Sequence, residues 1–375
     1  MRYFLLIVLF LLFISLAPAQ QGIADWPVFR GNANLTGMSE FELPASPQLL
    51  WSVSTGVRTK SSPVVSKGIV YFGNDKGTLN AVSTDGKIEM KYFAGSAIDA
   101  APMVFGEKLI FGTNDGFLRA IEKTTGKLLW SYTTDNQIAG SANVWLIGKK
   151  AGIVVGSYDY YLHCVDPETG KLIWKVESEN YINGTPSISN GKIVFGGCDG
   201  IIRIVDPLSG RETDTIDIGV YIASSPALSS GVAYFGDYNG TKYCVNLNSG
   251  EIAWKIPSKE ESGAILGIPA LGPSAVILGS EDKFIYCFDP DDGKLKWKYR
   301  TNGRVISSPV VTDTKVLATG MDGYVYILSL TDGKKIWSFN AGTPISSSPA
   351  VVKGRFYILT EDGRLLAFGE KVNKK

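Results

Sequence analysis

The chain has 375 residues, 45% of them hydrophobic and 19% charged, and its formal net charge at pH 7 is +1. A nearly balanced charge argues against a surface built for nucleic acid or for an anionic membrane. The 42 glycines and the aromatic residues, which include 17 Tyr, 17 Phe and 8 Trp, are spread along the chain with no linker between regions of different composition. We therefore expect a single all-β architecture of many short strands and turns.

The first residues have the three parts of a secretory signal peptide. Arg2 provides the basic start, an apolar run extends from Tyr3 to about Leu16, and Ala17-Pro18-Ala19 forms a small-x-small cleavage site. We predict cleavage after Ala19 and export to the periplasm or to the outside of the cell. The apolar run is shorter than the roughly 18 to 20 residues of a membrane span, so we expect no transmembrane span in the mature chain. An uncleaved anchor is the alternative.

A repeated unit of roughly 40 residues begins at Lys60. It starts with Ser-Ser-Pro or a variant, continues through an apolar strand, a tight turn and two further strands, and ends with a D-x-x-x-G-K turn and a strand that contains Trp. Such a period indicates a propeller or another repeat architecture. The eight starts fall at Pro63, Pro102, Ala142, Pro186, Pro226, Pro269, Pro309 and Pro349.

The strands that contain Trp indicate how the repeat closes. Only seven of the eight units end with this last strand. Five of the seven strands contain Trp, and the other two have Met90 and Asp214 in its place. The eighth strand lies at the other end of the chain, where PQLLWSVSTG around Trp51 resembles GKLLWSYTTD around Trp130. We therefore predict an all-β, eight-bladed propeller of four-stranded blades, in which an N-terminal strand completes the C-terminal blade and leaves no open sheet edge. A flat β-solenoid is the alternative.

The predicted propeller spans residues 47–371. It is preceded by the signal peptide at 1–19 and by an extension at 20–46 that packs on the propeller, and it is followed by a tail at 372–375. Asp-Gly and Asn-Gly pairs between strands indicate tight hairpin turns. We expect the repeated tryptophans to pack between neighbouring blades, close to small glycines. They are Trp51, Trp130, Trp174, Trp254, Trp297 and Trp337.

Three cysteines occupy a repeat position where other repeats have Ala or Ile. Cys164, Cys244 and Cys287 are therefore expected to be free thiols in the core. Cys198 has no such equivalent, and its role stays open. We interpret the single histidine, His163, as a packed or surface strand residue. The aspartates of the tight turns recur from blade to blade, so we interpret them as turn formers that bond to their own backbone.

The ends of the repeats resemble a known family. GKLLW, GKLIW, GEIAW, GKLKW and GKKIW, with preceding segments such as VDPETGKLIW, are similar to the tryptophan-docking repeat of pyrroloquinoline-quinone (PQQ) type propellers. The segment DWPVFRGNANLTGMS from Asp25 resembles the one before the first blade in that superfamily. The resemblance implies an eight-bladed propeller and one of two functions: a quinoprotein alcohol dehydrogenase with PQQ and calcium, or a non-catalytic propeller of the BamB type, which acts in outer-membrane assembly.

The second function fits the sequence better. Eight blades consume essentially the whole chain, which leaves no cover for a cofactor, and the adjacent Cys-Cys pair of the dehydrogenases is absent. The lipid-bearing Cys of BamB-type proteins is absent as well, so we predict no lipid anchor. Four residues before seven of the eight repeat starts stands Ile or Val, which predicts a mostly aliphatic rim around the channel. The following positions offer one base, Lys60, and one acid, Asp99, which are too few ligands for calcium.

We therefore predict a non-enzymatic, exported, monomeric scaffold of the cell envelope that binds a protein partner and has no catalytic, cofactor-binding or metal-binding residues. The candidate contacts on the upper rim are Arg58, Lys60, Asp99 and Arg304. A dehydrogenase that uses PQQ and calcium is the first alternative. A glycan-binding propeller is the second alternative, because aromatic faces suit sugars. The tyrosines that motivate it are Tyr158, Tyr160, Tyr161, Tyr181 and Tyr221.

Overall fold

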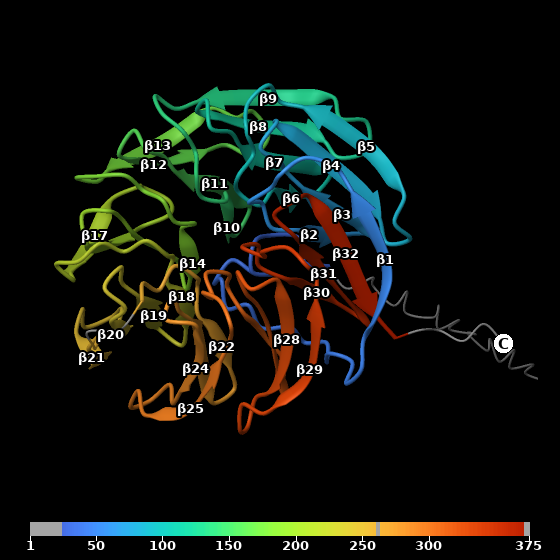
Figure 1. Ribbon diagram of the computed structural model, residues 1–375. Coiled ribbons are helices and arrows are strands. Elements are labelled where there is room, and N and C mark those ends of the chain that lie inside the picture. The colour runs from blue at the N-terminus through green and yellow to red at the C-terminus, as the bar shows by residue number, and fades with distance from the viewer. Residues whose placement is uncertain (1–24, 260–262, 371–375) are drawn as a thin grey trace, which may run out of the picture.

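The computed structural model describes residues 25–259 and 263–370. The predicted signal peptide and the predicted tail at 372–375 lie outside these ranges. Eight four-stranded antiparallel sheets stand side by side as the blades of a closed ring (Figure 1). The described ranges contain strands and turns, and none of their segments is a helix long and apolar enough to cross a membrane. The predicted eight-bladed propeller is confirmed.

Seven blades are continuous in sequence, and their strands follow one another from the channel outward. Blades 1 to 4 consist of β2 (Val64–Ser66), β3 (Ile69–Phe72), β4 (Thr78–Ser83) and β5 (Ile88–Phe93); β6 (Met103–Phe105), β7 (Lys108–Gly112), β8 (Phe117–Glu122) and β9 (Leu128–Thr133); β10 (Asn143–Ile147), β11 (Lys150–Gly156), β12 (Tyr161–Val165) and β13 (Leu172–Glu177); β14 (Ser187–Ser189), β15 (Lys192–Gly196), β16 (Ile201–Val205) and β17 (Glu212–Asp217). Blades 5 to 7 consist of β18 (Ala227–Ser229), β19 (Val232–Gly236), β20 (Lys242–Asn246) and β21 (Ile252–Ile256); β22 (Ala270–Gly272), β23 (Ala275–Gly279), β24 (Phe284–Phe288) and β25 (Leu295–Arg300); β26 (Val310–Val311), β27 (Lys315–Thr319), β28 (Tyr324–Ser329) and β29 (Lys335–Asn340).

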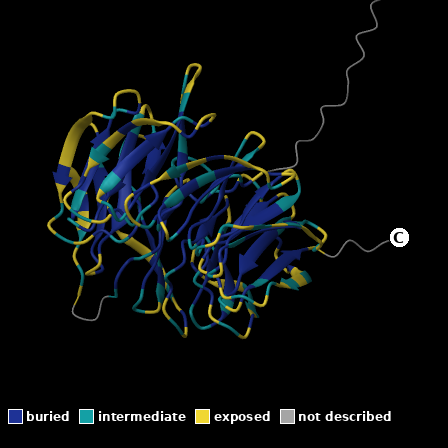
Figure 2. Ribbon diagram, turned by 90° about the horizontal axis from the view of Figure 1, so that it is seen from above, coloured by how far each residue is buried: buried dark blue, intermediate teal, exposed yellow. Residues whose placement is uncertain are grey.

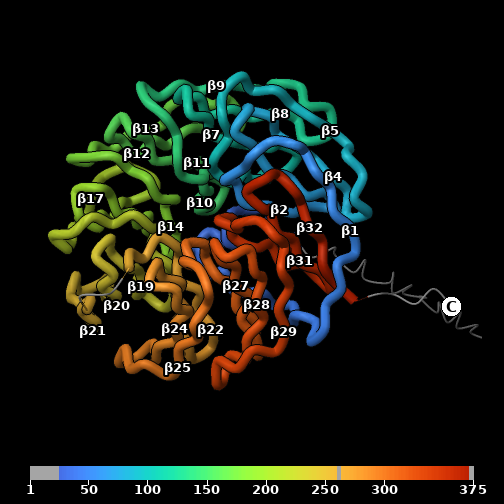
Figure 3. Tube along the Cα trace, viewed as in Figure 1, coloured from blue at the N-terminus to red at the C-terminus, as the bar shows by residue number. Residues whose placement is uncertain are grey.

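Blade 8 is shared between the two ends of the chain. Its strands are β30 (Ala350–Val352), β31 (Arg355–Leu359), β32 (Arg364–Gly369) and, on the outside, β1 (Gln48–Ser54). The N-terminal β1 lies antiparallel to the C-terminal β32, with Trp51 opposite Ala367 (Figure 3). Backbone hydrogen bonds therefore close the ring where the chain begins and ends, as the displaced Trp51 repeat predicted.

The inner and middle strands form the core, while the outermost strands are mostly exposed (Figure 2). In each blade a β-bulge shifts the pairing of the last two strands next to the position of the repeated tryptophan. Cys164, Cys244 and Cys287 lie directly opposite Trp174, Trp254 and Trp297. All four cysteines are free and buried, which confirms the expectation of free thiols for these three. The tryptophan opposite each of the three explains why its side chain is small.

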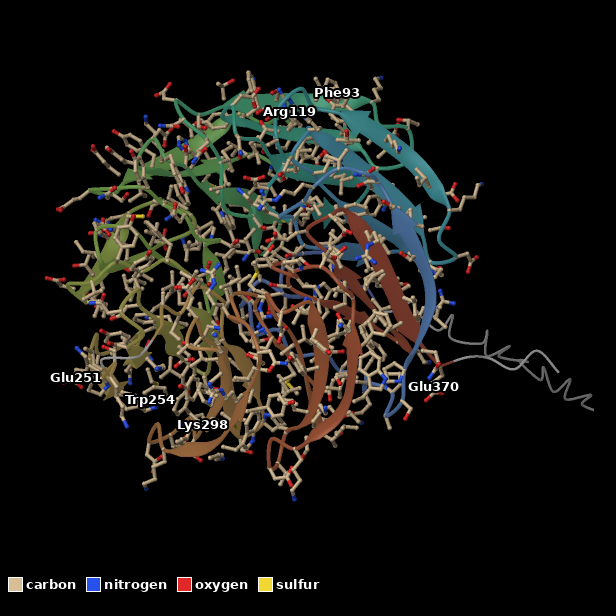
Figure 4. The ribbon with its side chains drawn as sticks, in the orientation of Figure 1. Phe93, Arg119, Glu251, Trp254, Lys298 and Glu370 are labelled. Atoms are coloured by element: carbon tan, nitrogen blue, oxygen red, sulfur yellow. The ribbon has the colours of Figure 1, made fainter. Side chains whose placement is uncertain are left out.

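Five of the six repeated tryptophans reach the turn between the third and fourth strands of the next blade, here called the outer turn. Trp254, in the outermost strand of blade 5 (Figure 4), donates its indole N–H to the carbonyl of Pro290 at 2.9 Å. Its ring lies on Gly293, which has a φ of +69° and where a Cβ would come within 2.9 Å of the ring. Glycine is required there both for the left-handed backbone and for the close approach. Trp51, Trp130, Trp174 and Trp297 dock in the same way.

The segment before β1 crosses the inside of the ring. Its backbone pairs with the first strands of six blades and, through the side chain of Asn143, with that of blade 3. The Arg30 side chain is completely buried, and it donates to the carbonyls of Pro269, at 3.0 Å, and Pro309. Burial lowers the pKa of Arg30 to about 9, so the guanidinium stays charged at neutral pH. This segment, residues 26–42, therefore ties the blades together from within.

Candidate functional site

The upper face is the face that carries the connections between blades and the turns between second and third strands, here called middle turns. Eight backbone hydrogen bonds fix it, one in each blade, from a middle turn to the connection that enters the same blade. The donor and acceptor pairs are Asp75 and Arg58, Asn114 and Ala97, Tyr158 and Gln137, Cys198 and Tyr181, Tyr238 and Tyr221, Glu281 and Ala264, Met321 and Arg304, and Glu361 and Pro344. The backbone here is the same in every blade, so the blades differ in their side chains.

The expected aliphatic rim is wrong. The branched residues four positions before each repeat start, such as Ile98 and Ile138, are completely buried. They wedge between blades against glycines of the second strand: a Cβ on Gly112 would come within 2.3 Å of Ile138. These residues are aliphatic because they fill the joint between two sheets, and they take no part in lining the channel.

Most residues that line the channel are small or polar, and Leu266, Ile268 and Ile306 line it as well. The mouth opens into a cavity of about 190 Å³ whose lining includes Phe29 of the N-terminal segment. Around the wall, hydroxyls of the repeated Ser-Ser-Pro motif accept backbone N–H groups from the preceding blade, as when Ser348 accepts from Ser308 at 3.0 Å and Ser62 accepts from Ser348 at 2.9 Å. The motif therefore links neighbouring blades.

The four predicted rim residues all form ion pairs. Lys60 and Asp99 line the cavity together, with 3.6 Å between ammonium and carboxylate, and Asp99 also accepts from the Asn114 amide at 3.0 Å. Arg58 lies 3.6 Å from Glu361, and the Arg304 guanidinium lies 2.8 Å from Glu281. The two arginine pairs bridge successive blades at the same repeat positions. The structure thus brings Lys60 and Asp99 together and leaves the two arginines in separate pairs.

Five tyrosines form a second feature of the upper face, over blades 3 to 5. This tyrosine arc consists of Tyr158, Tyr160, Tyr181, Tyr221 and Tyr238. Tyr158 and Tyr181 stack with 4.5 Å between ring centroids, and Tyr160 contacts Tyr181 at 5.3 Å. Tyr221 and Tyr238 meet edge to face at 5.6 Å. Tyr238 is 55% exposed, the most of the five, so the arc offers accessible aromatic surface.

Sequence reasoning found four of these five and included Tyr161, which lies elsewhere. The Tyr161 ring packs in β12 beside His163 and under the Lys175 ammonium, which is 3.9 Å from the ring centroid. Tyr238 was missed, although it occupies the same repeat position as Tyr158. Aligning the middle turns of all repeats would have found it.

Cys198 lies between the two groups of tyrosines. Its sulfur accepts from the Asn183 amide at 3.0 Å, and burial raises the pKa of the thiol. A hydrogen bond with the Cys198 sulfur raises the pKa of Tyr221 to about 12. A thiol with a raised pKa is a weak nucleophile at neutral pH. Cys198 therefore joins the two halves of the arc, which answers the question that its sequence position left open.

The turn aspartates have partners beyond their own backbone. Asp159 accepts from the backbone N–H of Tyr161 at 3.0 Å and lies 3.0 Å from the imidazole Nε2 of His163. Arg203, Tyr286 and Tyr326 hold the equivalent aspartates in three other blades. His163 is buried and also contacts the Tyr132 hydroxyl. It is a packed residue that clamps a middle turn beneath the tyrosine arc.

The residues around the channel do not fit PQQ and calcium. Calcium takes six to eight oxygen ligands, usually with several carboxylates, whereas Asp99 is the single acid among the described residues that line the cavity. PQQ carries three carboxylates, and the single lining cation, Lys60, already faces Asp99. No group of three or more His, Cys, Asp or Glu is placed to hold a metal ion within the described ranges.

Comparisons with known proteins agree with this fold. Among solved structures, BamB from Moraxella catarrhalis has a TM-score of 0.74 at 18% identity, covering 86% of this chain and 100% of that one. The computationally designed protein Ika8 has a TM-score of 0.76 at 15% identity, with the same coverage. The quinohemoprotein alcohol dehydrogenase from Comamonas testosteroni has a TM-score of 0.78 at 14% identity, covering 94% of this chain and 82% of that one.

At these identities the structural likeness shows the fold alone, and no curated protein sequence matches the chain. The family model described as outer membrane protein assembly factor BamB matches residues 44–151, 146–241 and 238–371. These three matches together cover the whole propeller. The chain therefore belongs to the PQQ-like β-propeller family that this BamB model describes.

Proposed function

We propose that this protein is a non-enzymatic scaffold of the cell envelope that binds another protein through its upper face. Membership of the BamB-described family supports an envelope role. The observation that carries the proposal is the tyrosine arc, in which Tyr160, Tyr221 and Tyr238 are each more than 40% exposed on one face. Tyrosine is enriched at protein interfaces because its ring buries a large apolar area while its hydroxyl keeps a hydrogen bond.

The arrangement of the rings favours a protein partner over a glycan. A sugar stacks on a free aromatic face, but Tyr158 and Tyr181 lie nearly parallel, with 21° between their planes, and cover one face of each other. These two rings therefore offer a sugar at most one face each, and their hydroxyls can bond to the main chain of a partner. A PQQ-dependent dehydrogenase is disfavoured by the side chains around the channel, where one acid and one base face each other.

Site-specific cross-linking tests the proposal. A photoreactive amino acid replaces Tyr238 on the upper face or, as a control, Asp292, an exposed residue in an outer turn on the opposite face. Irradiation of the native envelope should yield one dominant protein adduct from position 238 and none from position 292. No adduct at position 238, or the same adducts at both positions, would contradict the proposal. A glycan captured by the unmodified protein in an array would favour the alternative.

The proposed location has its own measurement. Export with cleavage after Ala19 predicts a mature chain that begins at Gln20. Mass spectrometry of the protein purified from the envelope fraction should therefore find Gln20 as the first residue. A full-length chain starting at Met1 would instead indicate an uncleaved anchor.

A further inference from the structure

The loops that carry the tyrosine arc contain acids and no basic residue. Six segments form this part of the upper face: residues 134–141, 157–160, 178–185, 197–200, 218–225 and 237–241. Asp135 and Glu179 are exposed there, and each uses only its backbone N–H to bond to a turn aspartate. Asp135 and Glu179 are therefore the exposed carboxylates of these loops, because a local partner holds each of the other three.

Those three carboxylates are buried or bound. Asp159 faces His163, Asp199 faces Arg203 at 2.6 Å, and Asp237 accepts from the Tyr243 hydroxyl at 2.9 Å. Elsewhere on the upper face an exposed cation accompanies the acids, as with Arg304 beside Glu281 and Arg58 beside Glu361. The tyrosine arc thus combines exposed rings with two exposed acids, Asp135 and Glu179, in loops that contain no base.

We propose that the tyrosine arc binds an extended, basic segment of the partner protein, with Arg or Lys side chains stacked on the exposed rings of Tyr160, Tyr221 and Tyr238. This inference rests on the proposed function and specifies the chemistry of the partner. A guanidinium or ammonium group is attracted to the face of an aromatic ring. Asp135 and Glu179 add charge complementarity at the edges of the arc, and the tyrosine hydroxyls can bond to the backbone of the segment.

The shape of the arc explains why the segment is extended. The five tyrosines follow three consecutive blades around the mouth of the channel, so their exposed rings lie along a curved track. An extended chain alternates its side chains, which allows successive basic residues to reach successive tyrosines. A compact partner surface would meet fewer of these positions at once.

Fluorescence anisotropy with labelled synthetic peptides provides the test. The probes are four repeats of Gly-Arg-Ser, of Gly-Glu-Ser and of Gly-Ser-Ser, titrated with the full-length mature protein. We expect the basic peptide to bind, with an affinity that falls as salt rises, and the acidic and neutral peptides to bind at least about tenfold more weakly. Tyr238→Ala and Glu179→Gln should each weaken binding of the basic peptide about two- to fivefold.

Asp292→Asn is the matched control, because it removes one exposed acid from the opposite face and should leave binding unchanged. Equal binding of the basic and acidic peptides would overturn the proposal, as would binding that Tyr238→Ala and Glu179→Gln leave intact. Circular dichroism of each variant shows that it is folded, so lost binding is not lost structure.

The same probes separate this proposal from the proposed function. If position 238 cross-links a partner that the basic peptide cannot displace, the scaffold function stands and the assigned partner chemistry is wrong. If the basic peptide binds at the arc and no protein is captured from the envelope, the arc has the assigned chemistry and the scaffold function is wrong.

Discussion

Neighbouring blades make different contacts on the two faces of the ring: on the lower face, where the outer turns lie, and on the upper face, where the connections and middle turns lie. At the lower end, five joints repeat the same contact, in which an indole lies on a glycine of the next outer turn and donates to a carbonyl of that turn. At the upper end the backbone contact repeats in all eight blades, but the side chains above it are ion pairs in one part and tyrosines in another. The repeated tryptophan and backbone contacts hold the ring together, and the side chains of the upper face, which differ between blades, are free to recognise a partner.

Three lower joints depart from the rule, and one of them for a topological reason. Trp337 meets blade 8, whose last two strands, β32 and β1, come from opposite ends of the chain and are not joined by an outer turn. Its ring packs instead against Phe356 and Phe368. In the other two, Met90 and Asp214 stand over Gly126 and Gly250. Split-blade closure therefore removes one docking site and replaces it with an aromatic cluster.

The largest expected effect on stability comes from removing a tryptophan contact between two blades on the lower face. Trp297→Ala should lower the free energy of unfolding by about 3–5 kcal/mol, because it leaves a cavity over Gly333 and an unpaired carbonyl at Leu330. Asp214→Ala changes the same repeat position in blade 4, where the residue is exposed, and should cost less than about 0.5 kcal/mol. Urea denaturation measures both. Equal losses would show that the two joints do not differ as their contacts indicate.

The lower joints were predictable from sequence, and the upper ones only in part. The period of the repeat, the Trp51 strand and the small residues opposite most tryptophans follow from patterns that recur in most blades. The rim residues do not, because a position in a connection does not reveal whether its side chain enters the channel or the joint. Ile98 looked like a rim residue and fills a joint. Tyr238 could be found by aligning the middle turns, but its contact with Tyr221 could not, because a connection and a middle turn meet only in the folded blade.

The next effect probes the clamp beneath the tyrosine arc. Asp159→Asn should cost about 1.5–3 kcal/mol at neutral pH, because the buried carboxylate accepts charge-strengthened hydrogen bonds. Burial alone would raise the pKa of Asp159, but hydrogen bonds from His163 and from the N–H groups of Tyr161 and Asp135 outweigh it and hold the pKa below its ordinary value.

The sign of the pH dependence follows from that lowered pKa. A carboxyl group with a depressed pKa in the folded state stabilises the protein fully above its unfolded pKa, which is about 3.9. This stabilisation is lost as the pH falls from there through the folded pKa. The difference in unfolding free energy between the native protein and Asp159→Asn should therefore shrink below about pH 4. A difference that stays constant from neutral to acidic pH would assign the cost to packing alone.

A smaller effect tests the arc itself. Tyr181→Ala removes the ring that contacts both Tyr158 and Tyr160 and should lower the unfolding free energy by about 0.5–1.5 kcal/mol, the range for an aromatic pair. Tyr181→Phe keeps the ring and should leave stability nearly unchanged. Thermal melts of the two variants measure the difference. Equal melting temperatures would mean that the tyrosines contribute little to the joint and serve recognition alone.

The smallest effect belongs to the charged part of the upper face. Arg304→Gln breaks the pair with Glu281, and the arginine side chain is 54% exposed. An exposed ion pair contributes about 0–1 kcal/mol, because water and salt screen it and because two long side chains lose freedom when they pair. The loss should vanish at high ionic strength. Denaturation at low and high salt measures the loss for Arg304→Gln, with Tyr181→Ala as a control whose loss should not depend on salt. A salt-independent loss for Arg304→Gln would mean that the packing of its aliphatic stem matters more than its charge.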